Sequence, residues 1–250
     1  MSGALPQLRG LLRSLWIYRL RDPARRRRMD ALHAQFVRPG DIAFDIGCHV
    51  GDRTASLLRL GCEVVAVEPQ PLLLRALRAS FGTNPRLRLV EAAVDAREGE
   101  IVLHLNTANP TVATVSEAFI GAAAGAAGWE GQRWDERIRV PTTTLDALIQ
   151  RYGRPAFVKI DVEGHEASVL AGLSQPLPAL SFEFTTIQRE VARACVARLR
   201  ALGEWRYNAA LGESQGLLFE SWVSEQAIEK WLDSLPHAAN SGDIYARLAA

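Results

Sequence analysis

Short apolar runs alternate with longer amphipathic stretches over most of this sequence, a pattern typical of α/β proteins. The apolar runs predict strands at residues 42–46, 63–67, 86–91, 157–160 and 179–184. Apolar residues at helical spacing predict helices at 52–60, 71–81, 144–151 and 187–202. We therefore expect a mostly parallel sheet with helices on both faces.

The alternation breaks after the third predicted strand. Extra strands are predicted at residues 92–95, 101–105 and 137–143, a polar loop at 106–111, and a mobile or loosely helical segment at 121–131. An insertion here would line the substrate side of a crevice, so Asn106, Asn109 and Thr111 are candidate substrate contacts. The alternative is a turn held by asparagine side chains.

The last part of the chain predicts elements that close the sheet. Residues 205–208 and 216–219 predict a strand pair, and 224–232 predict a helix. Residues 240–245 are polar and turn-like, so we do not expect them in the core.

The N-terminal residues 5–20 predict an amphipathic helix, with apolar residues on one face at Leu8, Leu11, Leu12, Leu15 and Trp16. Such a face can lie on a membrane surface or mediate self-association, but packing on its own domain is the more common use. A second helix is predicted from the cap at Asp22 to about Phe36. The arginines at 25–28 predict a solvated face, with anionic substrate or lipid headgroups as the alternative. We therefore divide the chain into an N-terminal helical extension, 1–38, and a main domain, 39–250.

Composition indicates an ordinary globular protein. With 250 residues, 48% of them hydrophobic, and a net charge of +1, the chain can bury a core and has no bias towards nucleic acid. Cys48, Cys62 and Cys195 suggest neither a disulfide framework nor a zinc cluster, so a reducing cytoplasm is expected. No apolar run reaches the roughly 18 residues of a transmembrane helix, and Arg9 and Arg13 interrupt any signal-peptide core.

Residues 42–51 predict a strand followed by a glycine turn, where α/β proteins hold nucleotide-like cofactors. The turn is G-x-x-x-G between Gly47 and Gly51, with His49 where a dinucleotide fingerprint has its middle glycine. Asp45 at the strand end would repel phosphate and attract a cation. The turn therefore favours S-adenosylmethionine and disfavours a nicotinamide cofactor.

Glu68 ends the second predicted strand, 17 positions after Gly51. A carboxylate at that place in a Rossmann-like unit binds the ribose hydroxyls. The alternative is an exposed acid that merely ends a strand.

Three polar residues, Asp161, Glu163 and His165, follow the strand predicted at 157–160. If this strand neighbours the first one, Asp161 lies beside Asp45. Two adjacent carboxylates repel unless a cation lies between them. The sulfonium and ammonium of S-adenosylmethionine, or a divalent metal, would supply that cation.

Four motifs together resemble those of the FkbM family of S-adenosylmethionine-dependent methyltransferases: residues 45–51, Glu68-Pro69, residues 144–148, and Lys159-Ile-Asp-Val-Glu-Gly164. The resemblance implies a Rossmann-like class I methyltransferase fold with a seven-stranded, mostly parallel sheet, to which this chain adds the β-rich insertion and the N-terminal helices. It also implies methylation of a hydroxyl group on a sugar, glycolipid or secondary metabolite. By the same match, Gly47 and Gly51 would shape the cofactor turn, Glu68 would hold the ribose, and Asp161 and Glu163 would face the active site.

Methyl transfer to an alcohol needs a general base within hydrogen-bond reach of the hydroxyl. His165 is the first candidate because histidine titrates near neutrality, although it can equally be a surface histidine on a first helical turn. Asp161, Glu163 and Glu183 are the other candidates, whereas His49 in the turn would position the cofactor. Two further hypotheses stay open: a non-catalytic scaffold that binds a partner through residues 5–20, and a nicotinamide-dependent oxidoreductase.

Overall fold

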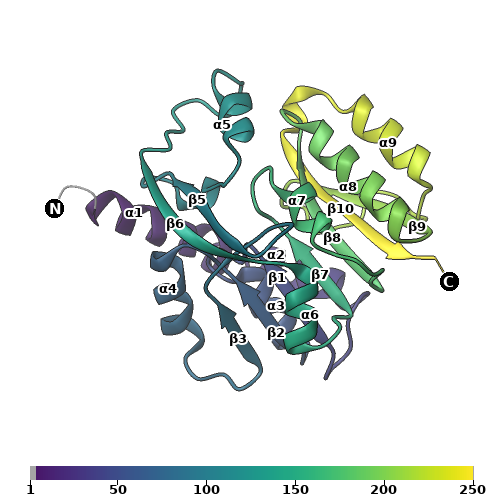
Figure 1. The fold of residues 1–250 in the computed structure, drawn as a ribbon, viewed down its shortest axis with the longest axis horizontal. Coiled ribbons are helices and arrows are strands. Elements are labelled where there is room, and N and C mark those ends of the chain that lie inside the picture. The colour runs from purple at the N-terminus through teal and green to yellow at the C-terminus, as the bar shows by residue number, and fades with distance from the viewer. Residues whose placement is uncertain (1–3, 250) are drawn as a thin grey trace.

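The computed structural model describes residues 4–249. Its main sheet has seven strands in the order β3-β2-β1-β7-β8-β10-β9 (Figure 1). Their bounds are β1 Ile42–Ile46, β2 Glu63–Val67, β3 Leu87–Val90, β7 Phe157–Ile160, β8 Ala179–Thr185, β9 Trp205–Leu211 and β10 Ser241–Leu248. All neighbours from β3 to β8 pair in parallel, and β10 runs antiparallel to β8 and β9. The expected α/β architecture with a mostly parallel seven-stranded sheet is confirmed.

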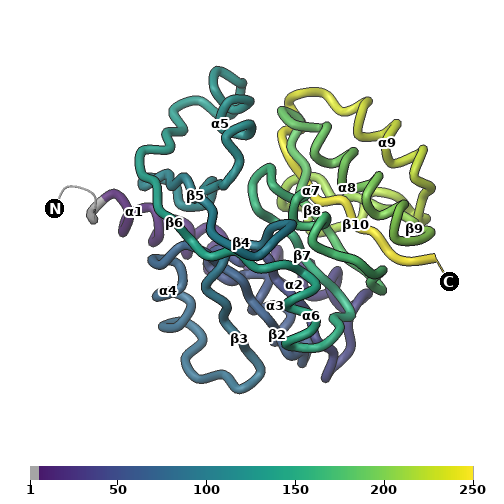
Figure 2. The backbone as a smooth tube through the Cα atoms, in the orientation of Figure 1, coloured from purple at the N-terminus to yellow at the C-terminus, as the bar shows by residue number. Residues whose placement is uncertain are grey.

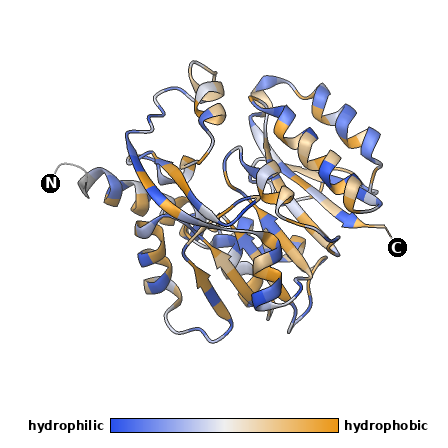
Figure 3. Ribbon diagram, viewed as in Figure 1, coloured by the Kyte–Doolittle hydropathy of each residue, from blue (hydrophilic) through white to orange (hydrophobic). Residues whose placement is uncertain are grey.

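Helices cover both faces of this sheet. They are α2 Pro23–His33, α3 Asp52–Arg59, α4 Pro71–Phe81, α6 Leu145–Tyr152, α7 Glu166–Ala171, α8 Arg189–Leu202 and α9 Glu225–Ser234, with a short 3-10 turn η3 at His237–Ala239. Successive side chains of one strand enter different core clusters: Phe44 packs with the residues of α7 and α8, and Ala43 packs with those of α3. Figure 3 shows largely hydrophobic strands at the centre of the molecule and many hydrophilic residues on α8 and α9.

The predicted β-rich insertion follows β3. It is a three-stranded sheet of order β4-β6-β5, with β4 Ala93–Val94, β5 Gly99–Leu105 and β6 Glu136–Thr143. The 3-10 turn η2 Pro110–Val112 and helix α5 Glu117–Ala123 lie between β5 and β6 (Figure 2). Phe119 of α5 packs edge-on against Trp129 and Trp134, which ties down part of the glycine- and alanine-rich segment.

Two expectations for the end of the chain were wrong. Residues 241–248 form β10, which lies between β8 and β9, although 240–245 looked too polar for the core. The buried Asp243 is tolerated because Lys159 Nζ lies 2.6 Å from its Oδ1. Residues 216–219 form no strand; Leu218 makes one backbone hydrogen bond to Ala209, and β10 takes the place beside β9.

The N-terminal helices α1 Ala4–Leu15 and η1 Trp16–Leu20, the latter a π-helix, precede α2. Leu11 of α1 packs with Val50 and Leu73, so this helix lies beside the glycine turn after β1 and beside α4. Three of the four arginines at 25–28 are exposed to solvent, as expected. Arg25 is buried, because it pairs with Asp52 at 2.8 Å. The residues from 4 to 249 contain no helix long and apolar enough to cross a bilayer.

Candidate functional site

The turn after β1 lies against the carboxyl end of β7, at the point where the strand order reverses. Gly47 has φ +75°, and a Cβ on it would lie 1.8 Å from the carbonyl oxygen of Asp161. The amide of Asp161 donates to the carbonyl of Ile46 at 3.0 Å. Ligands of open α/β sheets bind at such a switch point. Strands β1 and β7 are neighbours in the sheet. The predicted placement of Asp161 beside Asp45 depended on this pairing.

Glu68 lies under the same turn. Its carboxylate accepts hydrogen bonds from the amides of His49 and Gln70, both at 2.9 Å. Burial raises the pKa of Glu68 to about 8. Glu68 is therefore a buried and oriented acid at the end of β2. The alternative, an exposed acid that merely ends a strand, does not fit this structure.

Two pockets open beside this turn. The apolar pocket is lined by Val67, Glu68, the residues 92–94, Leu103, Ala113, Val115 and His165, among others. The polar pocket has a volume of about 340 Å³ and is lined by Tyr18, Asp45, Arg53, Lys159, Glu183, Glu213 and Asp243, among others. A purine ring and a ribose fit an apolar wall with one acid at its end, whereas charged walls suit a polar substrate.

Five residues line both pockets: Gly47, His49, Thr111, Asp161 and Glu163. His49 and Glu163 are non-glycine residues with positive φ, at 49° and 55°. Such backbone strain persists only where the surrounding structure enforces it, and it is common at active sites. Four of the five residues where the two pockets meet therefore belong to the two sequence motifs, and Thr111 belongs to the insertion.

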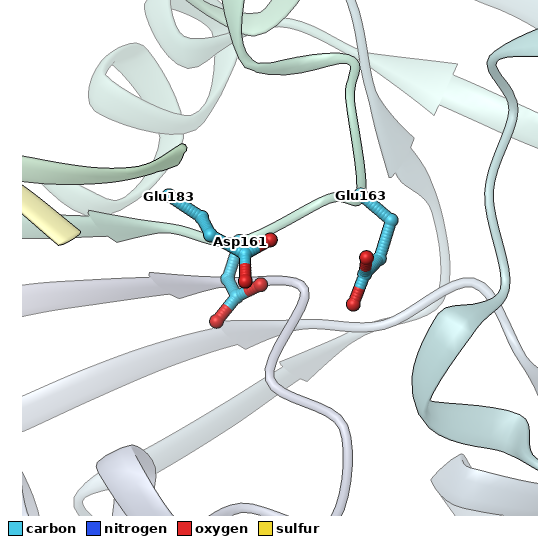
Figure 4. Close-up of side chains that lie close together, drawn as sticks. All are labelled: Asp161, Glu163 and Glu183. Carbon is cyan, nitrogen blue, oxygen red and sulfur yellow. The ribbon is translucent and has the colours of Figure 1, made fainter. Parts of the chain in front are cut away.

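Three carboxyl groups converge at this junction (Figure 4). One oxygen each from Asp161, Glu163 and Glu183 lie within 4.8 Å of one another. Burial, and then the charge of Asp161, raise the pKa values of Glu163 and Glu183 well above their usual range. Burial opposes ionisation of Asp161 as well, but the ammonium of Lys159, 3.1 Å away, lowers its pKa. The group can stabilise a sulfonium, and its oxygens are also suitable ligands for a divalent metal.

Asp45 and His165 lie at opposite sides of the site. Asp45 is buried in the wall of the polar pocket, where it accepts a 2.5 Å hydrogen bond from the hydroxyl of Thr54 and burial raises its pKa to about 6. His165 lines the apolar pocket, with Nε2 2.9 Å from Asp95. The structure therefore brings Asp161, Glu163 and Glu183 together and leaves His165 outside the polar pocket.

The insertion contributes Thr111 to both pockets, but Asn106 and Asn109 line neither. Both asparagine side chains donate to Gln132, at 2.9 and 3.2 Å. For these two asparagines, the structure supports the alternative in which their side chains hold a turn.

Sequence reasoning missed several residues of the polar pocket, among them Tyr18, Arg53, Lys159, Glu213 and Asp243. Lys159 gave a signal, since a lysine inside an apolar strand must find a buried partner. The other four come from η1, α3, the segment after β9 and β10 itself, and no local pattern marks them.

A model of the methyltransferase FkbM domain matches residues 45–226 of the chain. The chain belongs to this family. The motifs at the junction of the two pockets, from Asp45 to Gly51 and from Lys159 to Gly164, lie inside the matched range. The protein is therefore a methyltransferase, and the expected cofactor, S-adenosylmethionine, is confirmed. Nothing supports the oxidoreductase hypothesis.

Similar proteins include the 2-O-methyltransferase NoeI of Sinorhizobium fredii, 28% identical over 164 residues that cover 62% of this chain and 68% of that protein. Solved structures include an O-methyltransferase from Bacillus cereus in complex with SAH, with 13% identity, a TM-score of 0.46, and coverage of 100% of this chain and 91% of that one. Another is a precorrin-6y C5,15-methyltransferase from Geobacter metallireducens, also with 13% identity and a TM-score of 0.46, covering 88% and 86%.

The raised pKa values of Glu163 and Glu183 predict that S-adenosylmethionine binding releases protons. A carboxyl with a raised pKa keeps its proton to a higher pH than an ordinary carboxyl, and a nearby cation favours its ionised form. The affinity should therefore increase as the pH rises. Calorimetry in two buffers of different ionisation enthalpy measures the protons released.

S-adenosylhomocysteine is the control ligand, because it lacks the sulfonium charge and keeps the ribose that Glu68 would hold. Its affinity should change much less with pH. Equal pH dependence and equal proton release for the two ligands would show that the carboxyl group does not face the sulfonium.

Proposed function

We propose that the protein transfers a methyl group from S-adenosylmethionine to a hydroxyl group of a sugar, a glycolipid or a secondary metabolite. The observation that carries the proposal is the group of Asp161, Glu163 and Glu183 at the junction of an apolar and a polar pocket. A similar protein, NoeI, is named a 2-O-methyltransferase, which supports oxygen as the accepting atom.

The cofactor residues divide between the two sides of the turn. Glu68 would hold the ribose hydroxyls in the apolar pocket, and Gly47 and Gly51, both with positive φ, would give the turn its shape. His49 would position the cofactor, since its amide is bonded to Glu68 and its ring lines both pockets. Asp45 and Asp161 supply negative charge on the other side. When bound, S-adenosylmethionine supplies the methyl group and a good leaving group.

Glu183 is the residue we place as general base. It lines the polar pocket, where the acceptor would lie, and its Oε2 is buried without a hydrogen-bond partner among the residues described. Asp161 is a poorer base because Lys159 keeps its pKa low. Glu163 would share the negative charge beside the sulfonium, and His165, on the apolar side, is the alternative base. Holding the hydroxyl beside an oriented carboxylate is the main contribution of the protein to the rate.

The test is incubation with methyl-labelled S-adenosylmethionine and a panel of oligosaccharides, glycolipids and hydroxylated small metabolites, followed by mass spectrometry of the labelled product. We expect the label on an oxygen atom of one acceptor class. Label on nitrogen or carbon, or only on protein or nucleic acid, would contradict the proposal.

A further inference from the structure

The N-terminal helices expose a continuous apolar stripe. Leu8, Leu12, Trp16 and Leu20 follow one another at intervals of four residues, and each side chain is between 49% and 65% exposed. Spacing of four places them along one side of α1 and η1. We call these four residues the N-terminal apolar face. Among the large hydrophobic residues of the described chain, Leu218 is the one other with comparable exposure, at 47%.

The opposite side of the same helix is fixed to the domain. Leu11 is buried against Val50 and Leu73, and the hydroxyl of Ser14 lies 3.4 Å from that of Thr111. A Cβ on Gly10 would lie 2.8 Å from Pro110. The helix therefore cannot rotate to bury the N-terminal apolar face against its own domain.

The charge on the helices that carry this face is positive. Arg9, Arg13 and Arg21 are exposed beside it, and the sequence contains no acidic residue from 4 to 21. Arg26 and Arg27 are exposed on the first turns of α2. An apolar stripe flanked by arginines matches the boundary between the acyl chains and the headgroups of an anionic bilayer.

We propose that the N-terminal apolar face docks the protein on the surface of an anionic lipid bilayer. A second copy of the chain is a poor occupant, because joining two such faces would bring like charges together. Four side chains also fall well short of the roughly 20 residues per partner that a stable protein interface uses. A lipid surface needs no matching pocket and supplies the opposite charge.

The docking segment also contributes to the active site. Tyr18 of η1 lines the polar pocket and lies edge-on to His49, with ring centroids 5.4 Å apart. The segment that would meet the bilayer thus forms part of the wall of the proposed acceptor pocket. Docking can be tested without a known acceptor, so its failure and that of the proposed reaction are distinguishable.

The experiment is co-sedimentation of the full chain with vesicles of phosphatidylcholine alone and of phosphatidylcholine with phosphatidylglycerol. We expect binding to the anionic vesicles that weakens at high salt. The double variant Leu12→Gln, Trp16→Gln should lose most of this binding, and Arg13→Gln should weaken it by roughly fivefold. The matched control is Leu218→Gln, which removes a leucine of comparable exposure elsewhere and should bind like the unchanged protein.

Unchanged S-adenosylmethionine binding and thermal unfolding would show that the variants are folded. Equal binding to neutral and anionic vesicles, or equal losses for Leu218→Gln and the double variant, would overturn the proposal. A third outcome would also overturn the proposal: the protein does not bind vesicles, and analytical ultracentrifugation detects a dimer that the double variant abolishes. That result would assign the face to self-association.

Discussion

Replacing Glu183 by glutamine should lower kcat by about 10² to 10⁴-fold, the usual contribution of a general base. The change removes the proton acceptor and keeps the size of the side chain. Glutamine resembles the protonated carboxyl that the raised pKa of Glu183 favours, so S-adenosylmethionine affinity at neutral pH should change only a few-fold. Single-turnover kinetics with saturating cofactor, together with calorimetry, separate the two effects.

The matched comparison is His165→Gln, which removes the other candidate base. His165 lies in the apolar pocket and pairs with Asp95, so its loss should affect cofactor binding more than the chemical step. A larger fall in kcat for His165→Gln than for Glu183→Gln would assign the base to the histidine. The Glu183 variant should also release fewer protons when S-adenosylmethionine binds, a change that a purely structural role would not produce.

Replacing Gly47 by alanine should lower the free energy of unfolding by more than about 4 kcal/mol, which is the range of rare and severe substitutions. The new Cβ would lie 1.8 Å from the carbonyl oxygen of Asp161, so β1 and β7 would have to separate. Both strands are central in the sheet, and the ends of both form the proposed active site. Urea unfolding of the purified variant measures the loss.

Gly40→Ala separates this clash from the cost of the backbone conformation. Gly40 also has a positive φ, +90°, but a Cβ there would meet nothing within 4 Å. Its replacement should cost only the roughly 1–2 kcal/mol of a left-handed backbone for an L-residue. Similar losses for the two variants would mean that the turn moves away from β7 at little cost.

Much of the fold follows from local sequence, because the periods of strands and helices are local properties. The bounds of β1, β2 and α4 agree with the predicted ranges. The insertion was recognisable because the alternation of strands and helices breaks after β3. The C-terminal strand β10 was missed because its burial depends on a partner: Asp243 is tolerated beside Lys159, which is 84 residues away in the chain.

Part of the candidate site could likewise be predicted from local sequence, and part could not. The glycine turn, Glu68 and the acids after β7 could be named from the sequence, since each stands at the end of a recognisable strand. The convergence of Asp161 and Glu163 with Glu183 could not be predicted, because it depends on which strands are neighbours and where each one ends. The structure also decided between alternatives that were equal in sequence, as with Asn106, whose side chain holds a turn through Gln132.

The sequence alone thus determined the class of fold, the cofactor turn and the kind of cofactor, because these are set by short motifs whose geometry is local. Only the tertiary structure decided which charges face one another. Arg25 joins Glu213 across 188 residues, and the polar pocket takes its walls from η1, α3, β7, β8, β10 and the segment after β9. The physical reason is that burial and Coulomb interactions depend on distance in space, and chain position does not specify that distance.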